Sequence, residues 1–121
     1  MRARLAIIED DPVIGPMLSQ LLAMEGFDAT VISDGHKAAR MVSAGGYAGA
    51  ILDVMLPGKD GISILRELRS ADATKDLPVV MLTAKVDDHT TWAGWQAGAN
   101  YCMQKPFEPD ALVRVLRSLI G

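Results

Sequence analysis

Short apolar runs alternate along the chain with longer segments in which apolar residues recur every three or four positions. A short apolar run bounded by polar residues is typical of a buried strand, and the longer spacing is typical of an amphipathic helix. The predicted strands are Leu5–Ile8, Ala29–Ile32, Ala50–Leu52, Val79–Leu82 and Tyr101–Met103, and the predicted helices are Val13–Met24, His36–Ala44, Ile62–Leu68, Thr90–Ala97 and Ala111–Leu119. This strict alternation predicts an α/β fold in which helices cover both faces of a parallel sheet.

The predicted strands differ in how apolar they are. The first, third and fourth contain only apolar residues, which indicates central strands that are buried on both faces. The second and fifth contain or adjoin Thr30, Asn100 and Gln104, so we expect these two strands at the edges of the sheet.

Residues favoured at helix ends occupy the expected boundaries. Pro16 fits the first helix only if that helix begins near Val13, because a proline is tolerated in the first turn. The other boundary residues are a candidate N-cap, four glycines that end helices and a proline that begins one: Asp34, Gly26, Gly45, Gly46, Gly98 and Pro109.

The composition predicts a single soluble domain spanning residues 1–121. Half of the residues are hydrophobic, but no apolar stretch approaches the roughly 18 to 20 residues of a membrane span. Cys102 is the only cysteine and no secretory signal precedes the first strand, so we expect a cytoplasmic location. The net charge of −3 and the absence of a basic cluster argue against direct binding to nucleic acid.

Polar residues follow four of the predicted strands, where ligand sites form in sheets of this kind. Glu9, Asp10 and Asp11 follow the first strand and Asp53 follows the third. Clustered carboxylates repel one another unless their pKa values rise or a cation joins them, and an all-oxygen site suits Mg²⁺ or Mn²⁺. A simpler interpretation, strongest for Asp11, is a helix N-cap.

Asp53 has no evident structural role at the end of a buried strand, which favours a nucleophile that attacks phosphorus. Lys105, which follows the fifth strand, would neutralise the phosphoryl oxygens, and Thr83 would donate a hydrogen bond to one of them. Taken alone, Lys105 could equally be a surface lysine and Thr83 a helix cap.

The chain resembles the response-regulator receiver family over nearly its whole length, and the combination of motifs is highly specific. The resemblance rests on the segments Leu5–Pro12, Leu52–Gly61, Met81–Ala84 and Lys105–Phe107. It implies a five-stranded parallel sheet in the order 2-1-3-4-5, Asp53 as phosphoacceptor, and a cis bond before Pro106. It also implies Asp10, Asp53 and the Met55 carbonyl as metal ligands, Glu9 acting through a metal-bound water, and Thr83 and Lys105 binding the phosphoryl group.

One position departs from the family. Members commonly carry an aromatic residue three positions before the lysine, and here that position is Cys102, with Tyr101 beside it. Because neighbouring residues on a strand face opposite sides, Tyr101 cannot simply take its place. The usual aromatic switch is therefore in question.

Several other side chains are interpreted as structural. Trp92 and Trp95 lie one helical turn apart, and we expect them to face the core with Ala99; a partner-docking patch is the alternative. The residues expected to fill the core are Met17, Met24, Met41, Met81 and Met103, and those expected at the surface are His36 and His89.

The resemblance implies a phosphorylation-dependent switch that is not itself an enzyme, beyond assisting its own phosphorylation and dephosphorylation. The expected partner is a histidine kinase or phosphotransfer protein, and the expected response is a change of the face formed by the fourth helix, fifth strand and fifth helix, including an inducible homodimer. A flavodoxin-like electron carrier shares this topology, but the acids that follow the first strand of the present chain would repel a flavin phosphate. An aspartyl phosphatase would carry a second acid at position 55, where this chain has methionine.

Overall fold

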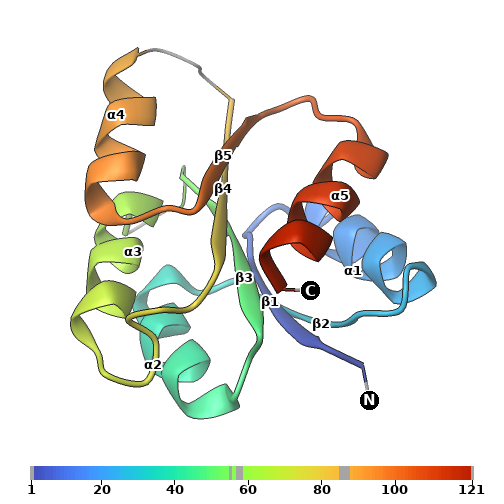
Figure 1. The fold of residues 1–121 in the computed structure, drawn as a ribbon, viewed down its shortest axis with the longest axis horizontal. Helices are drawn as coiled ribbons and strands as arrows, with labels where there is room; N and C mark the ends of the chain where they lie inside the picture. The colour runs from blue at the N-terminus through green and yellow to red at the C-terminus, as the bar shows by residue number, and fades with distance from the viewer. Residues whose placement is uncertain (1, 55, 57–58, 85–87, 121) are drawn as a thin grey trace.

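The computed structural model describes residues 2–54, 56, 59–84 and 88–120. The chain alternates strands and helices throughout (Figure 1). In chain order the elements are β1 (Arg4–Ile8), α1 (Ile14–Met24), β2 (Asp28–Ile32), α2 (Gly35–Gly45), β3 (Gly49–Asp53), α3 (Gly61–Ser70), β4 (Val79–Thr83), α4 (Asp88–Ala97), β5 (Tyr101–Gln104) and α5 (Pro109–Ile120). Each predicted element is present, and most extend one or two residues beyond the predicted bounds.

The five strands form one parallel sheet in the order β2-β1-β3-β4-β5, which confirms the expected topology. The edge strands are β2 and β5, as their polar residues predicted. Figure 1 shows α2, α3 and α4 on one face of the sheet and α1 and α5 on the other. In a parallel sheet of this kind all the strands end at the same edge, so the residues that follow them converge.

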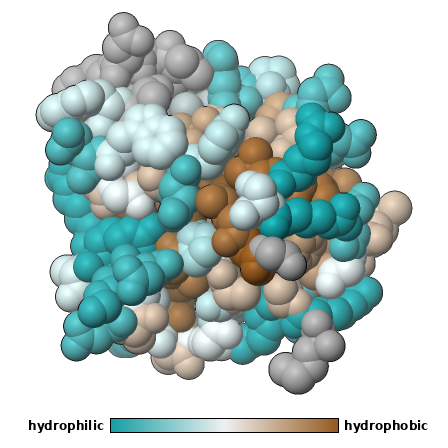
Figure 2. Space-filling model, in the orientation of Figure 1, coloured by the Kyte–Doolittle hydropathy of each residue, from teal (hydrophilic) through white to brown (hydrophobic). Residues whose placement is uncertain are grey.

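The core has two layers, one on each face of the sheet. Successive residues of β1 divide between them: Leu5 and Ile7 pack towards α1 and α5, whereas Ala6 and Ile8 pack towards α2 and α3. All five residues of β3 and of β4 are buried. On the face drawn in Figure 2, hydrophobic residues gather in the middle, beside α5, and hydrophilic residues surround them. Burial on both faces explains why the central strands are uninterrupted apolar runs.

The helix boundaries follow the predicted signals. Helix α1 begins at Ile14, which places Pro16 in the first turn. The Asp34 carboxylate accepts a hydrogen bond from the His36 amide at 2.9 Å and caps α2. Gly26, Gly46 and Gly98 adopt positive φ angles where helices end. The Lys105–Pro106 bond is cis, as the resemblance implied.

The expectation that the two tryptophans face the core is wrong. Trp92 and Trp95 are 61% and 49% exposed. The buried side of α4 instead presents Gly94, where an added Cβ would lie only 3.0 Å from the Met81 sulfur. The helix therefore packs too close to the sheet for a large side chain on that side, and the tryptophans lie outside it.

The methionine interpretation holds only in part. Met81 is buried in β4, but Met17, Met24 and Met41 are 53%, 85% and 43% exposed. These three lie off the buried stripes of their helices, which are formed by Gly15, Leu18 and Leu22 in α1 and by Gly35, Ala38 and Val42 in α2. Met103 is partly buried.

The remaining surface expectations concern the histidines and the membrane. His36 is exposed as predicted, whereas the side chain of His89 lies outside the described part of the structure. Among the residues described, no helix has the length and apolar character needed to cross a bilayer.

Candidate functional site

Backbone pairing beyond the strands brings the predicted site residues to one edge of the sheet. The Glu9 amide donates to the Ile32 carbonyl oxygen at 3.2 Å, so β1 remains paired with β2 at this residue. The Lys105 amide donates to the Thr83 carbonyl oxygen at 2.7 Å, which fixes the residue after β5 against the end of β4. Asp53 is itself the last residue of β3. Residues from four distant parts of the sequence therefore meet because of the strand order.

Lys105 bridges the two buried carboxylates of this edge. Its ammonium lies 3.1 Å from Asp53 Oδ2 and 3.4 Å from Glu9 Oε2. Glu9 is 2% exposed and Asp53 is 5% exposed. Buried carboxylates are costly unless they are paired or bind a cation, and in the described part of this edge one ammonium faces two acids.

The pKa values reflect this crowding. Burial, followed by the hydrogen bond and charge of Asp53, raises the pKa of Glu9 to about 7, although Lys105 opposes the rise. Burial by itself would lower the pKa of Lys105, but Asp53 and Glu9 outweigh it and raise that pKa. The site therefore keeps Lys105 charged and penalises a second carboxylate charge.

Glu9, Asp10 and Asp53 have the geometry of a metal site. One carboxylate oxygen from each lies within 4.8 Å of the others, and Asp10 is exposed to solvent whereas the other two are buried. An all-oxygen donor set with two buried acids fits Mg²⁺ and does not fit a tetrahedral zinc site. Met55, expected to contribute its carbonyl, lies outside the described residues.

Asp11 has the separate role that was considered for it. Its Oδ1 accepts hydrogen bonds from the amides of Val13 at 2.8 Å and Ile14 at 3.2 Å. These bonds lower its pKa. Asp11 therefore holds the amides at the start of α1, where Val13 occupies the N-cap position, and it lies outside the metal-binding group.

The loop after β3 holds Asp53 in place. The Val54 amide donates to the Leu82 carbonyl oxygen at 3.0 Å, and the Gly61 amide donates to the Val54 carbonyl oxygen at 2.8 Å. An added Cβ at Gly61 would lie 2.8 Å from the Val54 Cα and would also clash with the Asp53 backbone. Only glycine permits this close approach. Thr83, at the end of β4, is 4% exposed.

The sequence matches a described family over almost its whole length. Residues 5–117 match the response regulator receiver domain. This chain belongs to the response-regulator receiver family.

A curated relative of this receiver domain is the DNA-binding response regulator MtrA of Mycolicibacterium smegmatis, 42% identical over 118 residues that cover 98% of this chain and 50% of the relative. The chain thus spans about half the length of such relatives.

Two solved structures are also similar. A putative response regulator from Chloroflexus aurantiacus has a TM-score of 0.93 and 34% identity, with 99% of this chain and 98% of that chain covered. The receiver domain of the sensor histidine kinase PA1611 from Pseudomonas aeruginosa has a TM-score of 0.92 and 30% identity, with 100% and 99% covered. That structure holds a magnesium ion coordinated in its active-site cleft.

The neighbours Tyr101 and Cys102 of this receiver domain face opposite sides of β5, as predicted. Cys102 is half-buried against the core layer below α4, and its sulfur would lie 3.3 Å from a Cβ added at Gly94. Burial raises the pKa of its thiol. Tyr101 is 42% exposed and does not occupy the place beside α4 that Cys102 takes.

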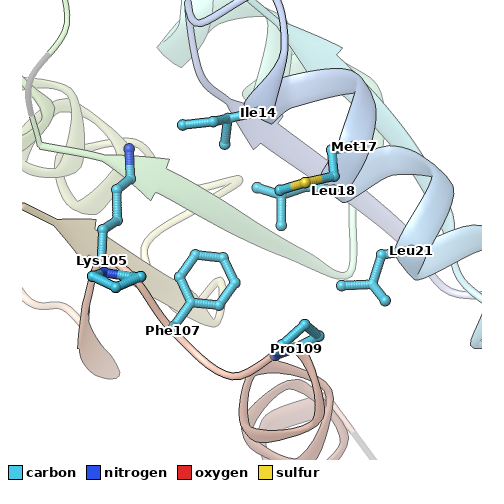
Figure 3. Close-up of a pocket in the computed structure, with 8 residues that line it drawn as sticks. Ile14, Met17, Leu18, Leu21, Lys105, Phe107 and Pro109 are labelled. Carbon is cyan, nitrogen blue, oxygen red and sulfur yellow. The ribbon is translucent and has the colours of Figure 1, made fainter.

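An apolar groove adjoins the charged edge, and no pattern in the sequence predicted it. The groove has a volume of about 430 Å³ and lies between α1 and the segment that leads into α5 (Figure 3). Its apolar walls are formed by Ile14, Met17, Leu18, Leu21, Phe107 and Pro109, and Lys105 and Pro106 stand at one end. From the apolar periodicity of α1 we expected its apolar residues in the core, which is correct for Leu18 but not for the exposed Met17.

Proposed function

We propose that this receiver domain accepts a phosphoryl group on Asp53 in the presence of Mg²⁺ and acts as a phosphorylation-dependent switch. The observation that carries the proposal is the Lys105 ammonium 3.1 Å from a buried Asp53 carboxylate that also belongs to a three-acid group. Asp53 is the last residue of a buried strand, so its position is rigid, as a nucleophile requires. The adjacent Lys105 ammonium provides a positive charge for the phosphoryl oxygens.

Each residue of the site has a proposed part in the transfer. An Asp53 carboxylate oxygen attacks phosphorus as the bond from phosphorus to the donor breaks and its electron pair leaves with the donor. Lys105 neutralises the phosphoryl oxygens, and the Thr83 hydroxyl donates a hydrogen bond to one of them. Glu9, Asp10, Asp53 and the Met55 carbonyl would hold Mg²⁺, with Glu9 acting through water. The ion, when bound, would offset negative charge on the transferring group.

The proposed partners follow from the family. A histidine kinase or phosphotransfer protein would supply the phosphoryl group in the cytoplasm, and residues 1–121 would act as one receiver domain. The domain would be a regulator with no catalytic activity beyond its own phosphorylation and dephosphorylation. Its output would pass through α4, β5 and α5, including a phosphorylation-dependent homodimer. In a longer protein like its relative MtrA, DNA binding would belong to the part outside this receiver.

Tryptophan fluorescence offers a direct test, because Trp92 and Trp95 lie on the proposed output face. Mg²⁺ with beryllofluoride, which mimics a phosphoryl group, is expected to change the emission of the wild-type protein and not that of Asp53→Asn. Asp34→Asn is the matched control, since asparagine also caps a helix and Asp34 is exposed. An equal response in Asp53→Asn and wild type would overturn the assignment.

A further inference from the structure

We propose that the apolar groove beside Lys105 binds the acyl group of a small acyl phosphate. The domain would then prefer phosphodonors with a longer hydrocarbon or an aromatic acyl group over acetyl phosphate. This inference rests on the proposed function, because the donor delivers its phosphoryl group to Asp53.

The groove has the size and lining of a site for a small apolar group. Its volume of about 430 Å³ falls within the range of ligand pockets, roughly 300 to 1,000 Å³. Leu18 is fully buried at its base, whereas Ile14, Leu21 and Phe107 are only partly buried at its walls. A ligand that covered these walls would remove apolar surface from water.

Lys105 connects the groove to the candidate phosphorylation site. Figure 3 shows its side chain extended along one end of the groove, while Met17 and Leu21 face Phe107 and Pro109 across the opening. The same ammonium lies 3.1 Å from Asp53 Oδ2. Lys105 therefore belongs both to the lining of the groove and to the proposed phosphoryl site.

The charge distribution specifies the kind of ligand. Among the described residues that line the groove, Lys105 is the one with an ionisable side chain, and its ammonium points to Asp53. A ligand that matches this arrangement has a hydrocarbon part for the groove and an anionic group at the lysine end. An acyl phosphate combines both parts and also carries a transferable phosphoryl group.

The transfer balances without any further reactant. An Asp53 oxygen forms a bond to phosphorus, the bond between phosphorus and the bridging acyl oxygen breaks, and its electron pair leaves on the carboxylate product. The carboxylate would depart from the groove, which is open to solvent.

The test compares half-saturating concentrations of acetyl phosphate and butyryl phosphate for phosphorylation of the full chain with Mg²⁺, followed by intact-protein mass. The two leaving carboxylates have nearly equal basicity, so a difference reports binding of the tail. Each buried methylene raises affinity about fourfold. Because butyryl phosphate has two more methylenes than acetyl phosphate, we expect its half-saturating concentration to be about fifteenfold lower.

Two methionines of α1 provide a matched pair of variants. Met17 lines the groove and Met24 does not, and both are exposed, so glutamine is tolerated at either position. Met17→Gln is expected to remove most of the preference for butyryl phosphate, so that the half-saturating concentration of this donor rises towards that of acetyl phosphate. Met24→Gln is expected to behave as the wild type.

The outcomes separate this inference from the proposed function. Equal half-saturating concentrations for both donors would overturn the groove assignment and leave phosphorylation of Asp53 intact. A Met17→Gln variant that keeps the preference and slows only a phosphorylated protein donor would give the groove to a protein partner instead. Failure of both donors to modify the wild-type chain would overturn the proposed function and this inference with it.

Discussion

The charged edge of the sheet and the flank formed by α4 and β5 are held together in different ways. At the charged edge, backbone packs on backbone: Gly61 lies directly against Asp53 and Val54, and Lys105 is anchored through its amide as well as its ammonium. On the flank, α4 rests at Gly94 on two sulfur-containing side chains, Met81 and Cys102.

The contrast suggests how the domain divides its work. Close backbone contacts and paired charges fix the chemical groups, because small displacements there are costly. Flexible sulfur-containing side chains adapt more easily to a shifted helix. The flank also exposes Trp92, Trp95 and Tyr101, so a movement of α4 would change the surface that a partner meets. The fixed edge suits the proposed chemistry, and the adaptable flank suits the proposed output.

The largest expected effect comes from removing the cation of the charged edge. Lys105→Met should slow phosphorylation by acetyl phosphate by about 10²-fold to 10³-fold, because no ammonium would offset the charge on the phosphoryl oxygens. Phosphorylation rates followed by intact-protein mass would measure this. Lys37→Met, at an exposed lysine of α2, is the control and should react at the wild-type rate.

A pair of glycine substitutions tests the contrast in packing itself. Gly61→Ala should lower the free energy of unfolding by about 3 kcal/mol, since its Cβ would meet backbone atoms that cannot move aside. Gly94→Ala should cost less than about 1 kcal/mol, because Met81 and Cys102 can adjust their side chains. Urea denaturation of both variants provides the comparison. If Gly94→Ala lowers the free energy of unfolding as much as Gly61→Ala or more, the two regions do not differ in packing as described.

The raised pKa of Glu9 predicts a pH dependence confined to the charged edge. Between pH 4.5 and about 7 the folded protein keeps a proton on Glu9 that the unfolded chain has released. Stability of the metal-free protein should therefore fall as pH rises through this range, by on the order of 1 kcal/mol relative to Glu9→Gln. Denaturation in EDTA across this range would measure it, with Glu108→Gln as an exposed control. If the difference in free energy of unfolding between wild type and Glu9→Gln does not change with pH, the pKa of Glu9 is not raised and this account of the charged edge is wrong.

The smallest expected effect lies on the outer surface of the flank. Trp92→Gln and Trp95→Gln should each change the free energy of unfolding by no more than about 0.5 kcal/mol, because both side chains are largely exposed. Thermal denaturation would detect a larger loss, which would place the side chains in the core after all.

The sequence predicted the charged edge better than the flank, for a physical reason. Asp53 and Lys105 follow buried strands, and parallel strand order alone brings such residues together. Trp92 and Trp95 depend on which way α4 is rotated, and that rotation is set by close packing at Gly94. Helical spacing shows that two residues share a side of a helix but not whether that side is buried.

The same limit applies to the groove and to the caps. Met17 belongs to the apolar pattern of α1, and such a pattern does not distinguish a side chain buried in the core from one that lines a groove at the surface. Local signals were reliable where the geometry is local: Asp34 caps α2, and Asp11 accepts hydrogen bonds from the amides at the start of α1. The groove requires α1 and Phe107, which are far apart in the sequence, to meet across a gap.

The central claim is that the end of β3 presents a phosphoacceptor. Peptide mapping by mass spectrometry after treatment with acetyl phosphate and Mg²⁺ tests it most directly. We predict a single phosphoryl group located on Asp53, with none incorporated into Asp53→Asn. A phosphoryl group on any other residue of the wild-type chain, or equal incorporation into the variant, would contradict it.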